Sequence, residues 1–405
     1  MHTWVEGGVT AAKGFQAAGV HCGIRKNRSK KDLALITSDT LADAAAVYTQ
    51  NRVIGAPCIV TKQHLGGGKA SAIIVNSGIA NTCAADGIEK ATAMCSLTAE
   101  ALGIAKEHVL VASTGVIGQS IDLSPIQQGI PQLLQNLSVE GHADAAEAIL
   151  TTDLAKKECA ITFTLGGKTC HIGGIAKGSG MIAPNMATML SFITTDAAID
   201  HTLLQQALSA CIADTFNLLT IDHNTSTNDM VILLANGKAD NPKITAEGED
   251  YQTFVDALFA LCGRLCKELA ADGEGATKTL LCRVSGAKTA LDARIAAREV
   301  LGSALFKAAM FGEDANWGRI LCAMGYSGAN FTVNGVDVDF VSNAGKVQVC
   351  KDGSGIDFSE QLAKEVLGES EILIDIRLSD GDVTATAYGC DLSYDYVKIN
   401  GDYRS

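Results

Sequence analysis

The segment KGSGMIAPNMATML, residues 177–190, constrains the fold more than any other part of the chain. It has no periodic apolar face, and Gly178, Gly180 and Pro184 interrupt regular structure, because glycine loosens the backbone while proline fixes φ and removes a hydrogen-bond donor. The sequence therefore predicts a shaped loop here, neither a helix nor a central strand. Such a loop would bring the hydroxyl of Thr188 to a defined place.

A threonine hydroxyl is a poor nucleophile until a base lies beside it. Cleavage of the bond before Thr188 would supply that base, because the freed α-amine titrates at about pH 8 and can accept the hydroxyl proton. Taken alone, the segment also fits a glycine-rich turn whose threonine bonds its own backbone. A dinucleotide loop is a poorer fit, since GSGMIA at 178–183 would have to open a helix and Pro184 follows it directly.

The complete string closely resembles the self-cleavage motif of the glutamate N-acetyltransferase family, also called the ornithine acetyltransferase family. The resemblance implies autocatalytic cleavage between Ala187 and Thr188, after which Thr188 is the nucleophile and carries the acetyl group. It divides the chain into an N-terminal (alpha) fragment, 1–187, and a C-terminal (beta) fragment, 188–405. Matching strings run from about residue 7 to the last residue, and no internal repeat or linker is evident.

Composition and net charge limit the classes of protein and of binding partner that the sequence allows. The chain has 405 residues, of which 47% are hydrophobic, with 41 Gly and only 5 Pro, so it can bury a large core. Its formal net charge of −13 argues against a nucleic acid or an anionic membrane as partner, both of which require a basic face. Small ionic substrates stay open, because a local pocket can differ from the total.

The 13 cysteines are an odd number and are scattered singly through apolar stretches, as at Cys95, Cys211, Cys322 and Cys350. Secreted disulfide frameworks are short and paired, so we expect reduced core thiols in a cytosolic protein. The pair at 262 and 266 lies on a predicted helix without further ligands nearby, which favours core packing over a metal site. The first residues, MHTWVEGG, lack signal-peptide features and no apolar run reaches 18 residues, so we predict a soluble, cytoplasmic protein.

Periodicity predicts an α/β fold of layered sheets and helices, and the resemblance places it in the ornithine acetyltransferase type, which is N-terminal-nucleophile-like. We expect strands over 32–38, 44–49, 71–81, 108–118, 189–197, 331–340, 371–378 and 382–388, with a hairpin over 158–178. We expect helices over 86–102, 142–150, 203–212 and near 358–367, and a further long helix that ends at about Ala270. Another helix should follow Ser124 as N-cap, with Pro125 at N1. A loop and strand are expected over 309–321.

The strand 108–118 ends in Ser113, Thr114 and Gly115, which read alone is an ordinary strand exit. The family places its oxyanion hole on Thr114 and Gly115. Donors aimed where negative charge develops are often the largest catalytic contribution, roughly 3–4 kcal/mol for each donor removed.

The resemblance also implies a substrate pocket formed by Thr151, Lys177, Glu274, Asn400 and the terminal Ser405, together with Thr188. Both substrates share an α-carboxylate, which we assign to Lys177, while Glu274 would favour a distal ammonium. Thr151 and Asn400 would be neutral partners. The chain has Leu154 where family members often repeat threonine, so it departs from the pattern next to Thr151.

Two further residues invite a functional reading. His223 could act as a general base, although a lone histidine in a polar turn is more often at the surface. Arg319, within AMFGEDANWGRIL, could pair with an acidic ligand or form a structural ion pair.

The activity implied by the resemblance is ping-pong acetyl transfer from N-acetylornithine to glutamate in arginine biosynthesis, with ornithine released. It implies no metal and no bound cofactor, leaves acetyl-CoA open as a second donor, and pairs two alpha with two beta fragments. The alternatives are a related N-terminal-nucleophile amidohydrolase or aminopeptidase, which would deacylate to water, and a non-enzymatic binding protein. The presence of Thr188, Thr114, Gly115 and Lys177 argues against the last of these.

Overall fold

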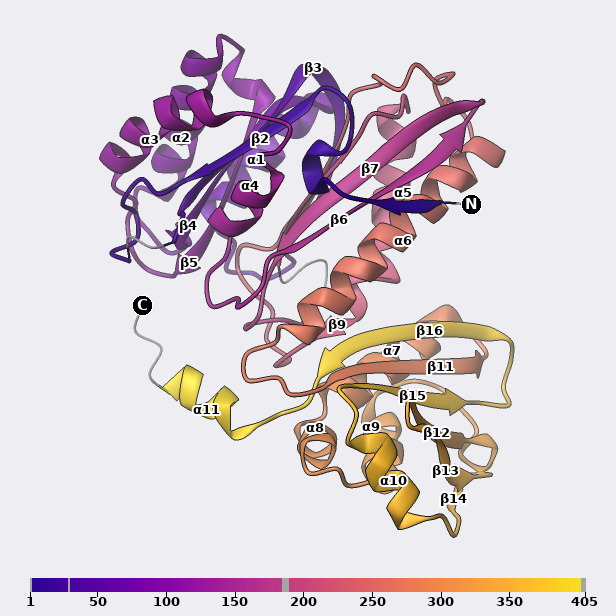
Figure 1. Cartoon of the computed structure of the whole chain (residues 1–405). Coiled ribbons are helices and arrows are strands. Elements are labelled where there is room, and N and C mark those ends of the chain that lie inside the picture. Colours follow the sequence, from indigo (N-terminus) through magenta and orange to yellow (C-terminus); the bar gives the residue numbers. More distant parts are fainter. Residues whose placement is uncertain (1, 28–29, 184–188, 402–405) are drawn as a thin grey trace.

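The computed structural model describes residues 2–27, 30–183 and 189–401, which fold around two β-sheets (Figure 1). The first sheet has nine strands in the order β1-β6-β7-β8-β10-β3-β4-β5, and β2 pairs with β3 beside that path. Its strands are β1 (Thr3–Val5), β2 (Phe15–Val20), β3 (Leu33–Tyr48), β4 (Lys69–Ile79), β5 (Val109–Val116), β6 (Lys157–Leu165), β7 (Lys168–Lys177), β8 (Leu190–Thr195) and β10 (Met230–Ala235).

Helices cover the first sheet and bury its apolar side chains. They are α1 (Ala56–His64), α2 (Gly87–Leu102), α3 (Leu123–Asn136), α4 (His142–Ala148), α5 (His201–Ala213) and α6 (Glu249–Ala271). In β8, Ile193 packs in one cluster with α5 and α6, whereas the neighbouring Phe192 packs in another with α4. Because successive side chains of a strand point to opposite faces, both faces of the sheet are buried here.

The second sheet belongs wholly to the C-terminal half and lies below the first in Figure 1. Its seven strands follow the order β14-β13-β12-β15-β11-β16-β9. They are β9 (Leu219–Thr220), β11 (Thr279–Ala287), β12 (Asp337–Ser342), β13 (Gly345–Lys351), β14 (Ser354–Gly355), β15 (Glu371–Arg377) and β16 (Val383–Cys390), with helices α7 (Ala290–Gly302), α8 (Ala304–Phe311), α9 (Trp317–Tyr326), α10 (Glu360–Leu367) and α11 (Tyr394–Gly401).

The α/β class and the layered arrangement are confirmed, as are most elements. The hairpin of β6 and β7 turns at Gly166 and Gly167, whose φ values of +51° and +76° are those that a two-residue hairpin turn requires. The helices over 86–102, 142–150 and 203–212 and the helix reaching Ala270 are present as α2, α4, α5 and α6.

Strand β3 corrects the expectation of two separate strands over 32–38 and 44–49. Its first half pairs with β2 and its second half with β10, while its register against β4 shifts between Thr37 and Ala42. The polar residues between the two apolar runs therefore mark an irregularity within one strand, because both halves are hydrogen-bonded to neighbouring strands of the sheet.

One helix start and one loop-and-strand segment were predicted wrongly. Helix α3 is capped by Asp122, whose carboxylate accepts from the Ser124 backbone N–H at 2.9 Å, so Ser124 lies inside the helix. The segment 309–321, predicted as loop and strand, contains the end of α8 and the start of α9. Each of these helices begins after a polar N-cap, Ser303 for α8 and Asn316 for α9. These caps were the sequence signals for the two helices.

The C-terminal region has two strands more than predicted, β13 and β14, which follow β12 in the chain, and the strand expected from 331 begins only at Asp337. Cys322 on α9 is exposed, which corrects its assignment to the core, because it lies on the outer face of that helix. Cys95, Cys211 and Cys350 are buried.

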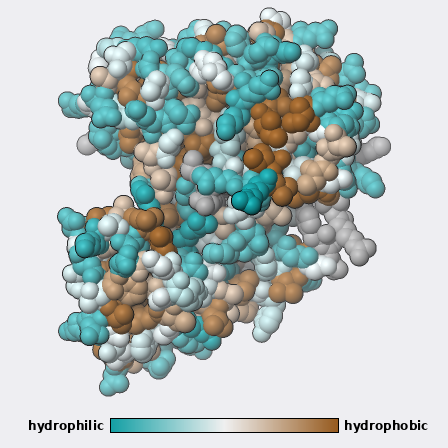
Figure 2. All heavy atoms as spheres, turned by 180° about the vertical axis from the view of Figure 1, so that it is seen from behind, coloured by the Kyte–Doolittle hydropathy of each residue, from teal (hydrophilic) through white to brown (hydrophobic). Residues whose placement is uncertain are grey.

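The surface opposite to that of Figure 1 mixes polar and apolar side chains, with apolar patches near the junction of the two parts (Figure 2). Among the residues that the structure describes, no helix combines the length and apolar character needed to cross a bilayer.

Candidate active site

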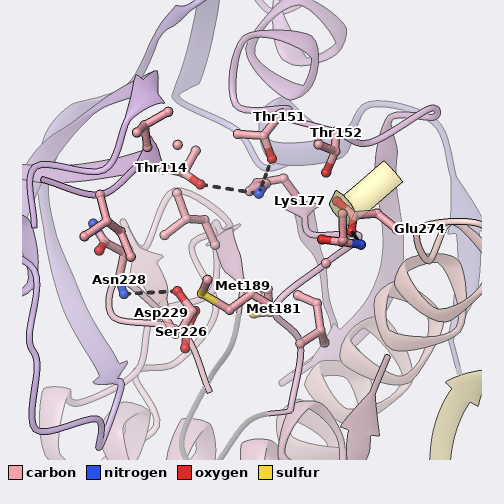
Figure 3. Close-up of a pocket in the computed structure, with 17 residues that line it drawn as sticks. Thr114, Thr151, Thr152, Lys177, Met181, Met189, Ser226, Asn228, Asp229 and Glu274 are labelled. Carbon is pink, nitrogen blue, oxygen red and sulfur yellow. Dashed lines mark hydrogen bonds between the residues drawn. The ribbon is translucent and has the colours of Figure 1, made fainter. Parts of the chain in front are cut away.

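A cavity of about 290 Å³ lies where β5 and β7 end and where β8 begins, with the segment before β10 along one side (Figure 3). Six of the residues singled out from the sequence line it, although they come from five different parts of the chain. They are Thr114, Gly115, Thr151, Lys177, Glu274 and Asn400.

Thr114 and Gly115 occupy the end of β5, paired in parallel with Ser77 and Gly78 of β4. Gly115 has φ of +131°, and a Cβ added there would lie 2.2 Å from the carbonyl carbon of Gly78. Only glycine tolerates both the backbone angle and this contact, so the close approach of β4 and β5 fixes where the end of β5 meets the cavity.

Lys177 is the last residue of β7, and its ammonium group is the cationic centre of the cavity. Its Nζ donates to Thr151 Oγ1 at 2.8 Å and to Thr114 Oγ1 at 3.3 Å, so both threonines point towards it in Figure 3. Burial lowers the pKa of Lys177, and the negative charge of Asp153 opposes that shift.

Asp153, two residues after the candidate Thr151, was given no role from the sequence. Its Oδ1 accepts from Lys157 Nζ at 2.6 Å and from the Gly178 N–H at 2.7 Å, and its Oδ2 accepts from the Thr151 N–H at 3.0 Å. An acidic residue beside a predicted substrate threonine was the available signal. The carboxylate joins the residues before β6 to the end of β7.

The loop predicted at 177–190 is confirmed over residues 178–183, while its ends belong to β7 and β8. Asp222 accepts from the backbone N–H groups of Met181 at 2.6 Å and Ile182 at 2.8 Å. Thr225 donates to the Ala183 carbonyl at 2.9 Å. The described part of the loop is therefore held by side chains from the segment between β9 and β10.

Glu274 lies on the side of the cavity away from Thr114 in Figure 3, and Asn400, which also lines the cavity, contacts it. Asn400 Nδ2 donates to Glu274 Oε2 at 2.8 Å, so α11 and the segment after α6 meet here. A Cβ at Gly180 would lie 2.3 Å from that same oxygen, so Glu274 packs directly on the loop.

Ser226, Asn228 and Asp229 form a third wall of the cavity. No role was assigned to these residues from the sequence, although a polar run just before a buried strand was a signal. Asn228 Nδ2 donates to the Ser113 carbonyl at 3.0 Å, which ties this wall to β5. Asp229 Oδ2 is buried and has no hydrogen-bond partner among the described residues. Burial raises the pKa of Asp229 well above its ordinary value.

Other candidates lie elsewhere. His223 is exposed and does not line the cavity, and Arg319 Nη1 donates to the Leu305 carbonyl at 2.6 Å rather than to an acid. Ala187, Thr188 and Ser405 lie outside the described residues, although Met189, the residue after Thr188, lines the cavity.

A larger cavity of about 500 Å³ adjoins the first, and both are lined by Gly115, Val116, Thr151 and Thr152. The charged residues that line it are all basic, namely Arg25, Lys26 and Lys30. Within the described ranges, no group of three His, Cys, Asp or Glu side chains is suited to hold a metal ion.

Comparisons with known proteins give consistent matches. A model of the ArgJ family matches residues 16–405. The arginine biosynthesis bifunctional protein ArgJ of Symbiobacterium thermophilum is 51% identical over 404 residues, which cover 99% of this chain and 100% of that protein. Its namesake in Bacillus subtilis is 49% identical over 403 residues, covering 99% of this chain and 97% of that one.

Among solved structures, the crystal structure of arginine biosynthesis bifunctional protein argJ from Bacillus halodurans matches with a TM-score of 0.50 and 45% identity. The match covers 53% of this chain and 100% of that one.

Proposed function

The chain belongs to the ArgJ family and is an enzyme of arginine biosynthesis, and from this we propose that it transfers an acetyl group from N2-acetyl-L-ornithine to L-glutamate. The proposal has the chain cleave itself between Ala187 and Thr188, which yields the fragments 1–187 and 188–405. The active enzyme would then use Thr188 as an N-terminal nucleophile.

In the first half-reaction, the Thr188 hydroxyl attacks the acetyl carbonyl, and the α-amine of the same residue accepts the hydroxyl proton. The oxyanion that forms is stabilised by the Thr114 hydroxyl and the Gly115 N–H. The carbon–nitrogen bond then breaks, the leaving amine takes up the proton, and ornithine departs from an acetyl ester of Thr188.

In the second half-reaction, the amine of glutamate attacks the ester carbonyl through the same oxyanion site. The ester bond breaks, the Thr188 hydroxyl is restored, and N-acetylglutamate leaves. The covalent ester divides one difficult transfer into two easier ones, and neither step needs a metal or a bound cofactor.

The observation that carries this proposal is the convergence of six residues on one cavity that Met189 also lines. The charges are suited to amino-acid substrates. Lys177 would bind the α-carboxylate that both substrates share, while Glu274 would bind the distal ammonium of the ornithine side chain. Thr151 and Asn400 would serve as neutral partners.

A second donor, acetyl-CoA, is part of the proposal. The adjoining cavity supports it, because Arg25, Lys26 and Lys30 suit an anionic ligand next to Thr114 and Gly115. Initial rates with glutamate and either N-acetylornithine or acetyl-CoA as donor would test this. Transfer from N-acetylornithine alone would remove acetyl-CoA from the proposal.

The proposed cleavage predicts that purified protein consists of two fragments, the larger of which begins at Thr188. Thr188→Ala should remain uncut and inactive, because the nucleophile and its base are lost together, whereas Thr188→Ser keeps a hydroxyl and should still be cut, with slower transfer. Intact mass and N-terminal sequencing measure the cleavage. An active enzyme that consists only of full-length chain would contradict the proposal.

Acetyl-enzyme formed with N-acetylornithine and freed of excess donor separates the acetyltransferase from a hydrolase. We expect glutamate to release the acetyl group as N-acetylglutamate much faster than water releases acetate. Rapid release by water alone would instead identify an amidohydrolase. Association of two alpha with two beta fragments and a cytoplasmic location complete the proposal.

A further inference from the structure

Asp153 lies in a buried charge cluster at the open end of the β6–β7 hairpin, where Lys157 begins β6 and Lys177 ends β7. Its side chain has no exposed surface, and its two oxygens accept from Lys157 Nζ, the Gly178 N–H and the Thr151 N–H. Its Oδ2 also lies 3.9 Å from Lys177 Nζ. Burial alone would raise the pKa of Asp153, but the charges of Lys177 and Lys157 hold it below its ordinary value, so the group is a carboxylate.

Lys177 links this carboxylate to the end of β5. A protonated lysine has only donors, so Thr151 Oγ1 and Thr114 Oγ1 must accept its hydrogen bonds. A Thr114 oxygen that accepts from Lys177 keeps its own hydrogen for an acceptor in the cavity. A neutral lysine amine has a lone pair and could instead take the Thr114 hydrogen. Protonation of Lys177 therefore rules out donation from Thr114 to Lys177 and leaves the Thr114 hydrogen for the cavity.

Several charged groups act on Lys177. Burial lowers the pKa of Lys177, and the positive charges of Lys157 and Arg25 lower it further. The negative charge of Asp153 raises this pKa more than that of Asp229 does. Burial raises the pKa of Asp229, and a carboxyl group with a raised pKa gives up its proton less readily, so Asp229 is the weaker counter-ion. Asp153 is thus the carboxylate on which the charge of Lys177 chiefly depends.

We propose that Asp153 is a positioning residue that keeps Lys177 protonated, so that Thr114 directs its hydroxyl hydrogen into the cavity. The part played by Thr114 in stabilising an oxyanion rests on the proposed function, whereas the dependence of Lys177 on Asp153 does not. Asp153 acts through Lys177 and Thr114 without touching substrate.

The pH dependence of kcat tests this. Lys177 loses its proton as pH rises through its pKa, so activity should fall on the alkaline side. Asp153→Asn keeps the shape of the side chain and removes its charge, so the pKa of Lys177 should fall further. The alkaline limb of the kcat profile, where activity falls as pH rises, should then move to lower pH by about one unit or more. A uniform loss at every pH, with the limb unmoved, would show a merely structural role and overturn the proposal.

Asp272→Asn is the matched control, because Asp272 contacts Lys157 in the same buried cluster and has no recorded contact with Lys177. Its alkaline limb should stay with that of the wild type. If Asp153→Asn fails to fold, Asp153→Ser, which also removes the carboxylate, takes its place. The alkaline limb should again move to lower pH, and a limb that stays with that of the wild type would overturn the proposal.

A titration that does not depend on acetyl transfer separates this proposal from the proposed function. Protein labelled with 13C at lysine Cε reports the protonation of Lys177 directly, with the signal assigned through Lys177→Arg. Its midpoint should be lower in Asp153→Asn than in the wild type and unchanged in Asp272→Asn. An unmoved midpoint in Asp153→Asn overturns the proposal, whereas a lowered midpoint in an enzyme without transferase activity would refute only the proposed function.

Discussion

At the scale of single residues, Thr114 gives the sharpest test of the cavity. Its hydroxyl lies 3.3 Å from Lys177 Nζ at the end of β5, where a donor could face a developing oxyanion. Thr114→Ala should lower kcat by about a hundredfold or more with little change in KM, because the donor acts mainly in the transition state. Steady-state kinetics of the complete transfer measure both constants.

Thr152→Ala is the matched control for Thr114. Thr152 lines the same cavity, but its hydroxyl is bonded to Ser179 Oγ at 2.7 Å. Its loss should reduce kcat far less than the loss of the Thr114 hydroxyl. If Thr114→Ala raises only KM, Thr114 is a binding residue and its assignment to the oxyanion hole is wrong.

Glu274 tests how one pocket serves two substrates. Glu274→Gln removes the charge and keeps an oxygen that can accept from Asn400, so the wall of the cavity should persist. Formation of acetyl-enzyme from N-acetylornithine should suffer more than its deacylation by glutamate, by about 1–3 kcal/mol, the scale of a hydrogen bond to a charged group. Single-turnover rates of the two half-reactions measure this difference.

Two other outcomes for Glu274 are equally informative. Equal losses in both half-reactions would make it a structural residue, consistent with its packing on Gly180. A larger loss with glutamate would reverse the assignment.

At the scale of elements, α11 contributes to the cavity without contributing to the core. None of its residues is buried, yet Asn400 bonds Glu274 and Tyr396 OH donates to Asp222 at 3.2 Å. Asp222 in turn holds the backbone of Met181 and Ile182. The helix thus connects the second sheet to the loop 178–183.

Deletion of the chain from Tyr394 onward should therefore leave the fold nearly as stable as before and raise KM strongly. Thermal unfolding and steady-state kinetics on the same preparation separate the two effects. Val397→Ala, at a position 68% exposed on the same helix, should change neither quantity. Unfolding of the truncated protein at a much lower temperature would show instead that α11 supports the fold.

At the scale of the whole molecule, the first sheet is built from both proposed fragments. Strand β8, from the C-terminal half, lies between β7 and β10, and β10 pairs in turn with β3 from the N-terminal half. Both faces of these strands are buried. Separation of the fragments would break two strand pairings and expose the core on both faces.

After cleavage the fragments should accordingly remain together. Size-exclusion chromatography in native buffer should give one peak that contains both, as seen on a denaturing gel, and guanidinium chloride should be needed to part them. Uncut Thr188→Ala supplies the reference elution position. Two separate native peaks would contradict a shared sheet.

Much of the local structure could be read from the sequence, because it depends on neighbours within a few residues. The glycine pair at 166–167 requires a tight hairpin, apolar spacing predicts α2 and α6, and the glycines and proline at 178–184 predict a loop. The family resemblance added candidate site residues that local patterns do not indicate, namely Thr114, Lys177, Glu274 and Asn400.

Only the tertiary structure decided which residues meet. Thr114 and Lys177 are 63 positions apart in the chain, and Glu274 and Asn400 are 126 apart, so no local pattern records either contact. For the same reason the local pattern split β3 in two, because partners distant in the sequence hold it together. Asp153, one more acidic residue in a linear reading, becomes the buried counter-ion of Lys177, because burial and opposite charge act through space and not along the chain.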